Sequence, residues 1–516
     1  MQKQQKIGIW GIVLMVAAAI YGMGNTAIAY YQMGYAAIMW YVLAALFFFL
    51  PSALMFAEYG SVLKDARGGI YSWLEFAIGE RGAFIGTFIW LASWIIWLLS
   101  NTSVNFVNLS ETFWGRDMTT TWHLGGLSST ATLGILGSLF ILAVTFCVTR
   151  GFDKIAKIST ISGIFVFALT GFVLVGSVLV LFFHHGHLAQ PLTAKALVIS
   201  PNKNFMSPLA ILSFFVYAVF AYGGMETMGG ISDNVRDAQR NFPRGIMLAA
   251  VLMFGAYALL IFCWGISANW HHVLGGRGVT LGNVGYVLVS NLGYTLACSL
   301  HVSPANALIF SRWLVRAMGA VQLLAFTASF FVLVYSPLKS FIIGSPQKFW
   351  PQRLTKLNAA GMPANAMWLQ AGIIVVVLLV ISFGGTTMQD FYTILVDMMN
   401  VSSSVPYLFL IGAFPFFKRR LASLDAHQNL GRPFTAFTNS TQTTLTVTVA
   451  WLLVFFGVIF SVIQPLFSHD VKTFFWTAIG PVAFAVIAII MYHYTNAHEA
   501  HLLNAELRMQ EEDEND

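Results

Sequence analysis

Two glycine clusters interrupt apolar segments, and they contain the residues best placed to do chemistry in this chain. The first cluster is YGMGN at positions 21–25, and the second is YGGME at positions 222–226. Glycine inside a helix costs about 1 kcal/mol relative to alanine, so two close together predict a broken helix. A break leaves backbone N–H and C=O groups that lipid cannot satisfy, so it must face protein, water or a ligand.

The two ends of a broken helix suit opposite charges. The free N–H groups at the start of the second half lie at the positive end of its dipole, where a carboxylate is stabilised. The free carbonyls at the end of the first half suit an ammonium group. One break can therefore bind both charged groups of an amino acid backbone.

Acidic residues inside apolar segments are functional candidates by default. Glu226 is expected to bind a substrate amine or carry a proton, and a first-turn carboxylate stabilised by the helix dipole is the less favoured interpretation. For Asp397, a cation or proton site and a hydrogen bond to the serines at 402–404 remain equally open. Glu58 is expected to anchor the loop that follows it, near Arg67.

Three tryptophans, Trp90, Trp94 and Trp97, recur at helical spacing and form one aromatic face. Packing or an interfacial belt is the favoured interpretation of such a stripe. The alternative is that the stripe lines a pocket, and Trp94 is then the best candidate.

The composition places these residues in a membrane protein. Of the 516 residues, 57% are hydrophobic and only 9% are charged, whereas soluble domains carry roughly 25% charged residues. Apolar runs long enough to cross a bilayer recur from end to end. We predict twelve spans, at 7–34, 36–58, 83–110, 129–149, 158–183, 207–231, 243–267, 312–335, 364–383, 388–413, 441–464 and 472–495.

The distribution of basic residues predicts the orientation. With the N-terminus inside, 20 of the 27 Lys and Arg residues fall in inner segments and 7 in outer ones. The positive-inside rule then places both termini in the cytoplasm of a multi-pass protein of the plasma (inner) membrane.

Breaks in the first and sixth spans predict an internal repeat. Because each copy has five spans, the second copy must be inverted, which is a transporter arrangement. We expect a first repeat at 7–183, a second at 207–413, two further spans at 441–495 and an acidic cytoplasmic tail at 497–516. The tail is expected to be a solvated end, and a pH-sensing plug is the less favoured alternative.

At these residues the sequence resembles the amino acid-polyamine-organocation superfamily, and within it the glutamate/γ-aminobutyrate antiporter-like permeases. The resemblance covers nearly the whole chain and is specific because its motifs occur in a fixed order. They are YGMGN, then PSALMFAEYGSVLKDARGGIYSW at 51–73, FAYGGMETMGG at 220–230, DNVRDAQRNFPRGI at 233–246 and GMP at 361–363.

The resemblance implies an all-α fold of five plus five inverted helices with two extra C-terminal helices, and transport by alternating access. It implies substrate contacts in the first span, at Gly22, Met23, Gly24, Asn25 and Thr26, and in the sixth, at Tyr222, Gly223 and Gly224. Several proton-coupled relatives have a lysine within span five, but nothing after Lys157 in that span is basic here. This departure favours exchange over proton symport.

The leading hypothesis is therefore a secondary amino acid antiporter, and the resemblance suggests glutamate/γ-aminobutyrate exchange. The alternatives are a proton- or cation-coupled symporter and, less favoured, an amino acid-sensing receptor. The chain has no HExxH, GxSxG or GxxxxGK[ST] motif, which argues against an enzyme or an ATP-driven pump. We expect no cofactor, no metal and no nucleic acid, and we expect amino acids and the bilayer as partners. The oligomeric state stays open.

Overall fold

The helices and their connections make up the described part of the chain. The computed structural model describes residues 6–19, 22–64, 66, 68–276, 279, 281–385, 401, 403–428, 434–467 and 469–513. Within these ranges the one β-type contact is an isolated bridge between Ile7 and Val235. It joins the start of the chain to the segment that follows the second glycine cluster.

The helices follow one another with short connections. The first group of α-helices is α1 (Ile9–Ala19), α2 (Met23–Met33), α3 (Ala36–Ala44), α4 (Leu50–Val62), α5 (Ile70–Trp114), α6 (Ser129–Val148), α7 (Phe152–Phe183), α8 (Pro208–Phe220) and α9 (Ala238–Ser267). The second group is α10 (Val284–Ser299), α11 (Pro304–Ile342), α12 (Gln352–Thr355), α13 (Ala364–Phe383), α15 (Val405–Gln428), α16 (Ser440–Phe467) and α17 (Val471–Asp513). Short 3-10 or π segments are η1 (Ala45–Phe49), η2 (Thr119–Thr121), η3 (Lys203–Phe205), η4 (Met225–Asn234), η5 (Trp270–Leu274) and η6 (Gln347–Phe349).

Ten segments of the described chain are long and apolar enough to cross a membrane. Two of the twelve predicted spans are not among them. The first, at 7–34, is divided into α1 and α2, each of 11 residues, and most of the tenth, at 388–413, lies outside the described residues. The all-helical membrane fold is confirmed, and the count of twelve stays a prediction.

Both predicted helix breaks are present. α1 ends at Ala19 and α2 begins at Met23, with Gly22 as its extended N-cap residue, and Tyr21 lies outside the described residues. In the sixth span α8 ends at Phe220 and the chain continues as the 3-10 helix η4. Gly224, between them, has φ of 113°, a conformation that glycine adopts readily because it has no side chain.

Several boundaries differ from the predicted spans. α5 begins at Ile70 rather than 83, because a kink at Gly79, with φ of 82°, joins a short leading helix to the span itself. α15 continues to Gln428, beyond the predicted end at 413. α11 runs from Pro304 to Ile342, beyond both ends of the span predicted at 312–335.

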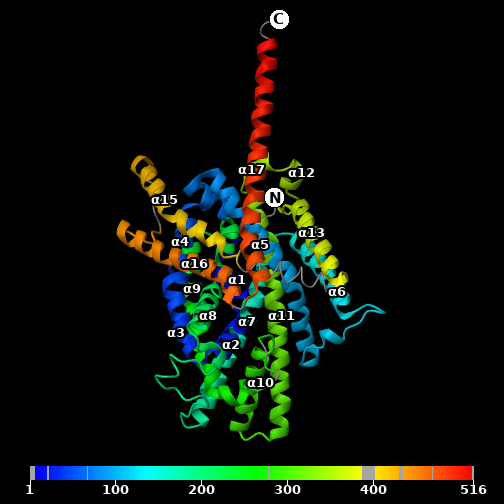
Figure 1. The fold of residues 1–516 in the computed structure, drawn as a ribbon, viewed down its shortest axis with the longest axis vertical. Coiled ribbons are helices and arrows are strands. Elements are labelled where there is room, and N and C mark those ends of the chain that lie inside the picture. Colours follow the sequence, from blue (N-terminus) through cyan, green and yellow to red (C-terminus); the bar gives the residue numbers. More distant parts are fainter. Residues whose placement is uncertain are drawn as a thin grey trace.

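One helix, α10, was not predicted. Its 16 residues are fewer than the roughly 20 that a span needs, so a search for long apolar runs passes over it. It packs on α11 and α7, beside the lower part of α11 in Figure 1.

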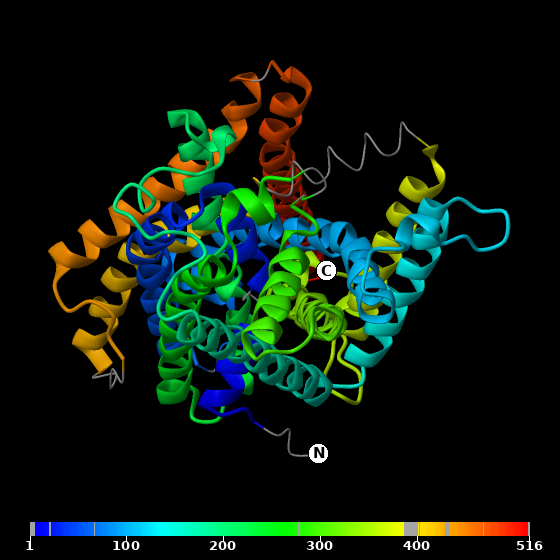
Figure 2. The ribbon, with the colours of Figure 1, turned by 90° about the horizontal axis from the view of Figure 1, so that it is seen from below.

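The broken helices lie inside the molecule. α1 packs against α7, α9 and α11, and η4 packs against α11, α4, α5 and α9. Figure 2 shows α11, in yellow-green, nearly end-on near the middle of the bundle. In Figure 1 α17 extends alone beyond the top of the bundle, and α10 lies at the bottom. We call these the α17 end and the α10 end.

Candidate functional site

A cavity of about 690 Å³ lies where the two broken helices meet. Its walls come from α2, α5, α8, α11, α15, α16 and the two breaks. The lining residues are Gly22, Asn25, Trp94, Trp97, Asn101, Ser213, Val216, Tyr217, Phe220, Ala221, Gly223, Gly224, Glu226, Gln322, Ala325, Phe326, Ser329, Ser403, Ser404, Tyr407, Ser461 and Gln464. We call it the central cavity.

Six of the predicted site residues line the central cavity. They are Gly22, Asn25, Trp94, Gly223, Gly224 and Glu226. The structure therefore brings together residues that lie about 200 positions apart in the sequence. Trp94 is the tryptophan of the aromatic stripe that the pocket interpretation favoured, and Trp97 lies beside it with ring centroids 5.9 Å apart.

The other predicted contacts lie behind the cavity wall. Thr26 is buried, donates to the Met23 carbonyl at 2.7 Å and accepts from Trp264 Nε1 at 3.0 Å. Met23 is also buried in the core. Gly24 faces α11, where the amide of Gln322 would lie 3.9 Å from a β-carbon at Gly24.

Tyr222 is also buried, and its hydroxyl donates to the Tyr41 carbonyl at 3.4 Å. Its ring stacks on Phe49, with centroids 4.5 Å apart. Asp397, the second predicted coupling residue, lies outside the described residues.

A residue that the sequence analysis did not single out connects the two breaks. The hydroxyl of Tyr257, on α9, accepts from the Gly22 N–H at 3.3 Å and donates to the Ala221 carbonyl at 3.2 Å. It thereby binds one free amide of the first break and one free carbonyl of the second. The sequence signal that could have indicated this role is a tyrosine hydroxyl in the middle of the apolar run 243–267.

The next amides of the first break are those of Met23 and Gly24, which begin α2. They have no carbonyl of their own helix to bind, because the first N–H groups of any helix lack an intrahelical partner. The side-chain oxygen of Asn25 accepts from the Tyr217 hydroxyl at 3.4 Å. The start of α2, beside the cavity, therefore has backbone N–H groups without an intrahelical partner.

Glu226 is almost fully buried at the second break, and its carboxylate contacts only donors. Oε1 accepts from Trp90 Nε1 at 3.1 Å, and Oε2 accepts from the Gly224 N–H at 3.0 Å and from the Tyr407 hydroxyl. The Tyr407 hydroxyl in turn accepts from the Gly224 N–H at 2.7 Å. Glu226 lies in the first turn of η4, as a carboxylate stabilised by the helix dipole would. It also lines the cavity, as a residue that binds a substrate amine or a proton would.

Trp90 and Tyr407 hold this carboxylate, and neither role was predicted. Trp90 was expected to pack in the aromatic stripe; it is buried in the core, and its indole N–H also binds Glu226. Tyr407 lies in α15, within the predicted tenth span, and only folding brings its hydroxyl to the sixth span.

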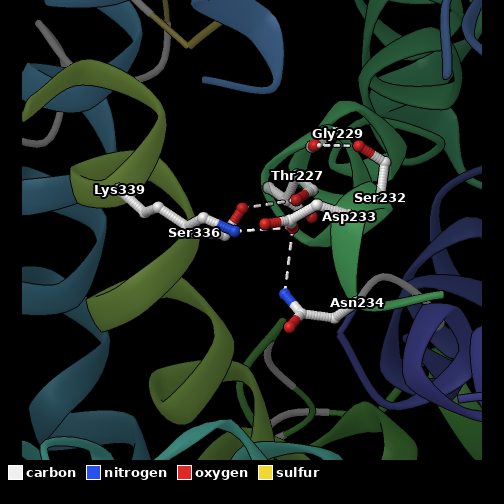
Figure 3. A network of polar contacts seen from close by, with 7 residues as sticks. All are labelled: Thr227, Gly229, Ser232, Asp233, Asn234, Ser336 and Lys339. Carbon is white, nitrogen blue, oxygen red and sulfur yellow. Dashed lines mark hydrogen bonds and ion pairs between the residues drawn. The ribbon is translucent and has the colours of Figure 1, made fainter. Parts of the chain in front are cut away.

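Polar contacts join η4 to α11 beyond the central cavity (Figure 3). The Ser336 hydroxyl donates to the Thr227 carbonyl, and Lys339 Nζ lies 2.6 Å from Asp233 Oδ1. Asn234 Nδ2 also donates to Asp233 Oδ1, at 3.0 Å. We call these five residues the η4–α11 clasp.

A second cavity, of about 910 Å³, lies on the far side of the clasp. Asp233, Asn234 and Lys339 line it, so the clasp forms part of the wall that separates it from the central cavity. Its remaining charged lining residues are Lys6, Lys64, Arg150, Asp153 and Asp237.

Glu58 was expected to anchor the loop that follows it, but its observed contacts are with α15 and with the segment before α16. It is fully buried; Oε1 lies 2.6 Å from Lys418 Nζ, and Oε2 accepts from the Ala436 N–H at 2.7 Å. The carboxylate thus holds α4 to α15 and to the segment before α16. Arg67, the expected partner, lies outside the described residues. Across the described residues, no three His, Cys, Asp or Glu side chains gather as a metal site would require.

Comparison with known proteins agrees with this architecture. The chain matches the family described as amino acid permease over residues 7–491. It is 42% identical over 489 residues to the inner membrane transporter YjeM of Escherichia coli (strain K12), which covers 95% of this chain and 96% of that protein. It is 22% identical over 506 residues to the glutamate/gamma-aminobutyrate antiporter of Lactococcus lactis subsp. lactis, covering 96% of this chain and 91% of that protein.

A further relative is the aspartate/glutamate permease AcaP of Lactococcus lactis subsp. cremoris, 22% identical over 418 residues and 80% of each chain. The names of these relatives describe transporters and permeases, not enzymes. Together with the apolar helices and the two broken spans, the comparisons identify a multi-pass inner membrane transporter. The chain belongs to the amino acid permease family.

Proposed function

We propose that this protein is an amino acid antiporter that works by alternating access around the central cavity. The observation that carries the proposal is the joining of two broken helices at one cavity, which the N-terminal end of α2 borders on one side and the Glu226 carboxylate on the other. Such a wall complements a zwitterion. Glutamate/γ-aminobutyrate exchange, named for a relative at 22% identity, is the first pair to test.

The substrate carboxylate is assigned to the start of α2. The amides of Met23 and Gly24 and the positive end of the helix dipole favour an anion there. A side chain at position 22 would contact Asn25. Because Gly22 has none, the approach to the start of α2 stays open.

The substrate ammonium is assigned to the second break. The Glu226 carboxylate lines the central cavity, and Gly223 and Gly224 keep the adjacent wall free of side chains, so a substrate ammonium can approach the carboxylate.

The fifth span, α7, supports exchange over proton symport, because it lacks the lysine that several proton-coupled relatives have within this span. In α7 the only basic residues are Lys154 and Lys157, both in the first two turns. Glu226 and Asp397 remain the candidates for a coupling or gating role. A proton-coupled symporter is therefore the alternative, and the buried Glu226 carboxylate is the observation that favours it.

Closure at the clasp supports alternating access. In this conformation the η4–α11 clasp separates the central cavity from the second cavity. Release toward the α17 end would require η4 and α11 to separate. Most Lys and Arg residues fall in the segments predicted to face the cytoplasm. By the positive-inside rule we assign the α17 end, with both termini, to the cytoplasmic side.

Reconstitution in liposomes tests the proposal. Uptake of labelled glutamate, γ-aminobutyrate and other amino acids is measured into vesicles that contain an amino acid or none. Uptake that needs an internal amino acid is expected. Uptake into empty vesicles driven by a proton or cation gradient would establish a symporter instead.

A further inference from the structure

One acidic residue carries the charge of the described wall of the central cavity. Among the described lining residues Glu226 is the one Asp, Glu, Lys or Arg, and the rest are neutral polar, aromatic or small. The described lining residues therefore offer no basic side chain to a second acidic group of a substrate.

A zwitterionic backbone already balances the charged groups of this cavity. Under the proposed function, its carboxylate binds at the start of α2 and its ammonium binds Glu226. An acidic side chain would add a second carboxylate with no counter-charge beside Glu226. Burying such an unpaired charge is costly, and placing like charges together costs several kcal/mol.

Neutral polar groups line the rest of the cavity. Amides from Asn101 and Gln322 come from α5 and α11, and Ser461 and Gln464 come from α16. α16 lies outside the five-plus-five repeat that the sequence predicts, so an additional helix contributes to the wall of the site. Amide and hydroxyl groups can hydrogen-bond an uncharged polar side chain, and Trp94 and Trp97 offer apolar surface.

We propose that the central cavity selects amino acids with an uncharged side chain and rejects acidic ones, and that Glu226 is the charge that sets this selection. The inference rests on the proposed function and narrows its substrate class. Of the glutamate/γ-aminobutyrate pair, γ-aminobutyrate carries no net charge and fits, whereas glutamate carries a second carboxylate and does not.

Thermal melting of the full-length protein in detergent tests the selection without relying on transport. The melting temperature is measured with each common amino acid and with γ-aminobutyrate. Only compounds with uncharged side chains are expected to raise it. In the isosteric pairs glutamine/glutamate and asparagine/aspartate, the neutral member is expected to bind at least about tenfold more tightly, which is a difference of about 1.4 kcal/mol.

A charge-introducing variant makes the test specific. Gln464→Lys places a cation in the cavity wall and is expected to raise affinity for glutamate or aspartate relative to the neutral isostere. Thr441→Lys is the matched control, because it adds the same charge to an exposed position of α16 that does not line the cavity. It is expected to leave the preference unchanged.

The outcomes separate this inference from the proposed function. Equal or tighter binding of glutamate than glutamine by the unmodified protein, with amino acid exchange intact in liposomes, would overturn the selection and leave the antiporter proposal standing. A failure of every amino acid to change the melting temperature and to exchange would overturn both.

Discussion

At the scale of single residues, Tyr257 serves both helix breaks with one hydroxyl. It satisfies a donor at Gly22 and an acceptor at Ala221, two groups that lipid cannot pair. Leaving a buried polar group without a partner costs about 1–3 kcal/mol.

Tyr257→Phe removes this hydroxyl and retains the ring. It is expected to destabilise the protein by about 1–3 kcal/mol and to slow exchange, because the two breaks lose their common partner. Thermal melting in detergent and liposome exchange measure the two effects. Tyr494→Phe is the control, since that side chain is 74% exposed. An unchanged melting temperature for Tyr257→Phe would show that water or another group replaces the hydroxyl.

Glu226→Gln tests the role of the buried carboxylate. The substitution removes the negative charge and turns an acceptor into an amide donor that faces the Gly224 N–H and the Tyr407 hydroxyl. Hydrogen bonds to charged groups contribute about 1.5–3 kcal/mol, so KM for exchange is expected to rise by about tenfold or more.

The matched control for this charge removal is Asp470→Asn, at an exposed position between α16 and α17. It is expected to leave KM unchanged. If Glu226→Gln also kept KM and the pH profile of exchange, the carboxylate would be a first-turn cap with no part in binding.

At the scale of elements, η4 and α11 form the barrier between the two cavities. One polar contact between them is the ion pair of Lys339 with Asp233, which is mostly buried. The ion pair of Lys348 with Glu80, which joins η6 to α5, is partly exposed. Removing one partner of a buried pair is costly because the other charge is left unpaired. Partly exposed pairs contribute little.

Asp233→Asn is therefore expected to loosen the clasp and open the central cavity toward the α17 end. The reporter is Thr227→Cys, at a buried position, after replacement of Cys147, Cys263 and Cys298 by serine. Labelling by a membrane-impermeant maleimide from that side is expected to rise at least severalfold. Glu80→Gln, the control for the exposed pair, should leave it unchanged. Equal labelling with and without Asp233→Asn would show that the ion pair does not hold the cavity closed.

At the scale of the whole molecule, substrate charge decides whether transport responds to the membrane potential. One-for-one exchange of two amino acids without net charge moves no charge across the bilayer. We therefore expect exchange of two neutral amino acids to keep the same rate when a potassium gradient with valinomycin sets the potential to different values. A rate that changes with the potential would indicate a charged substrate or a coupled ion.

Composition and local pattern were enough to determine the membrane environment and the two breaks. Lipid leaves only helices as a solution for long apolar runs, and paired glycines weaken a helix wherever it packs. The order of motifs was enough for the family, which the comparison with known proteins confirms. The ends of the helices were predicted less accurately from the sequence, as α5 and α11 show. A kink or a continuing helical turn does not change the average hydrophobicity of a segment.

The partners of the site were decided only by tertiary structure. Tyr257, Tyr407 and Trp90 lie far from the breaks in sequence, and each is one apolar-looking residue in an apolar helix. The same is true of the contribution of α16 to the cavity wall. Sequence spacing shows where a backbone must break, but the rotation of each helix decides which hydroxyl or indole reaches the groups that the break exposes, and that rotation follows from the packing of all the helices together.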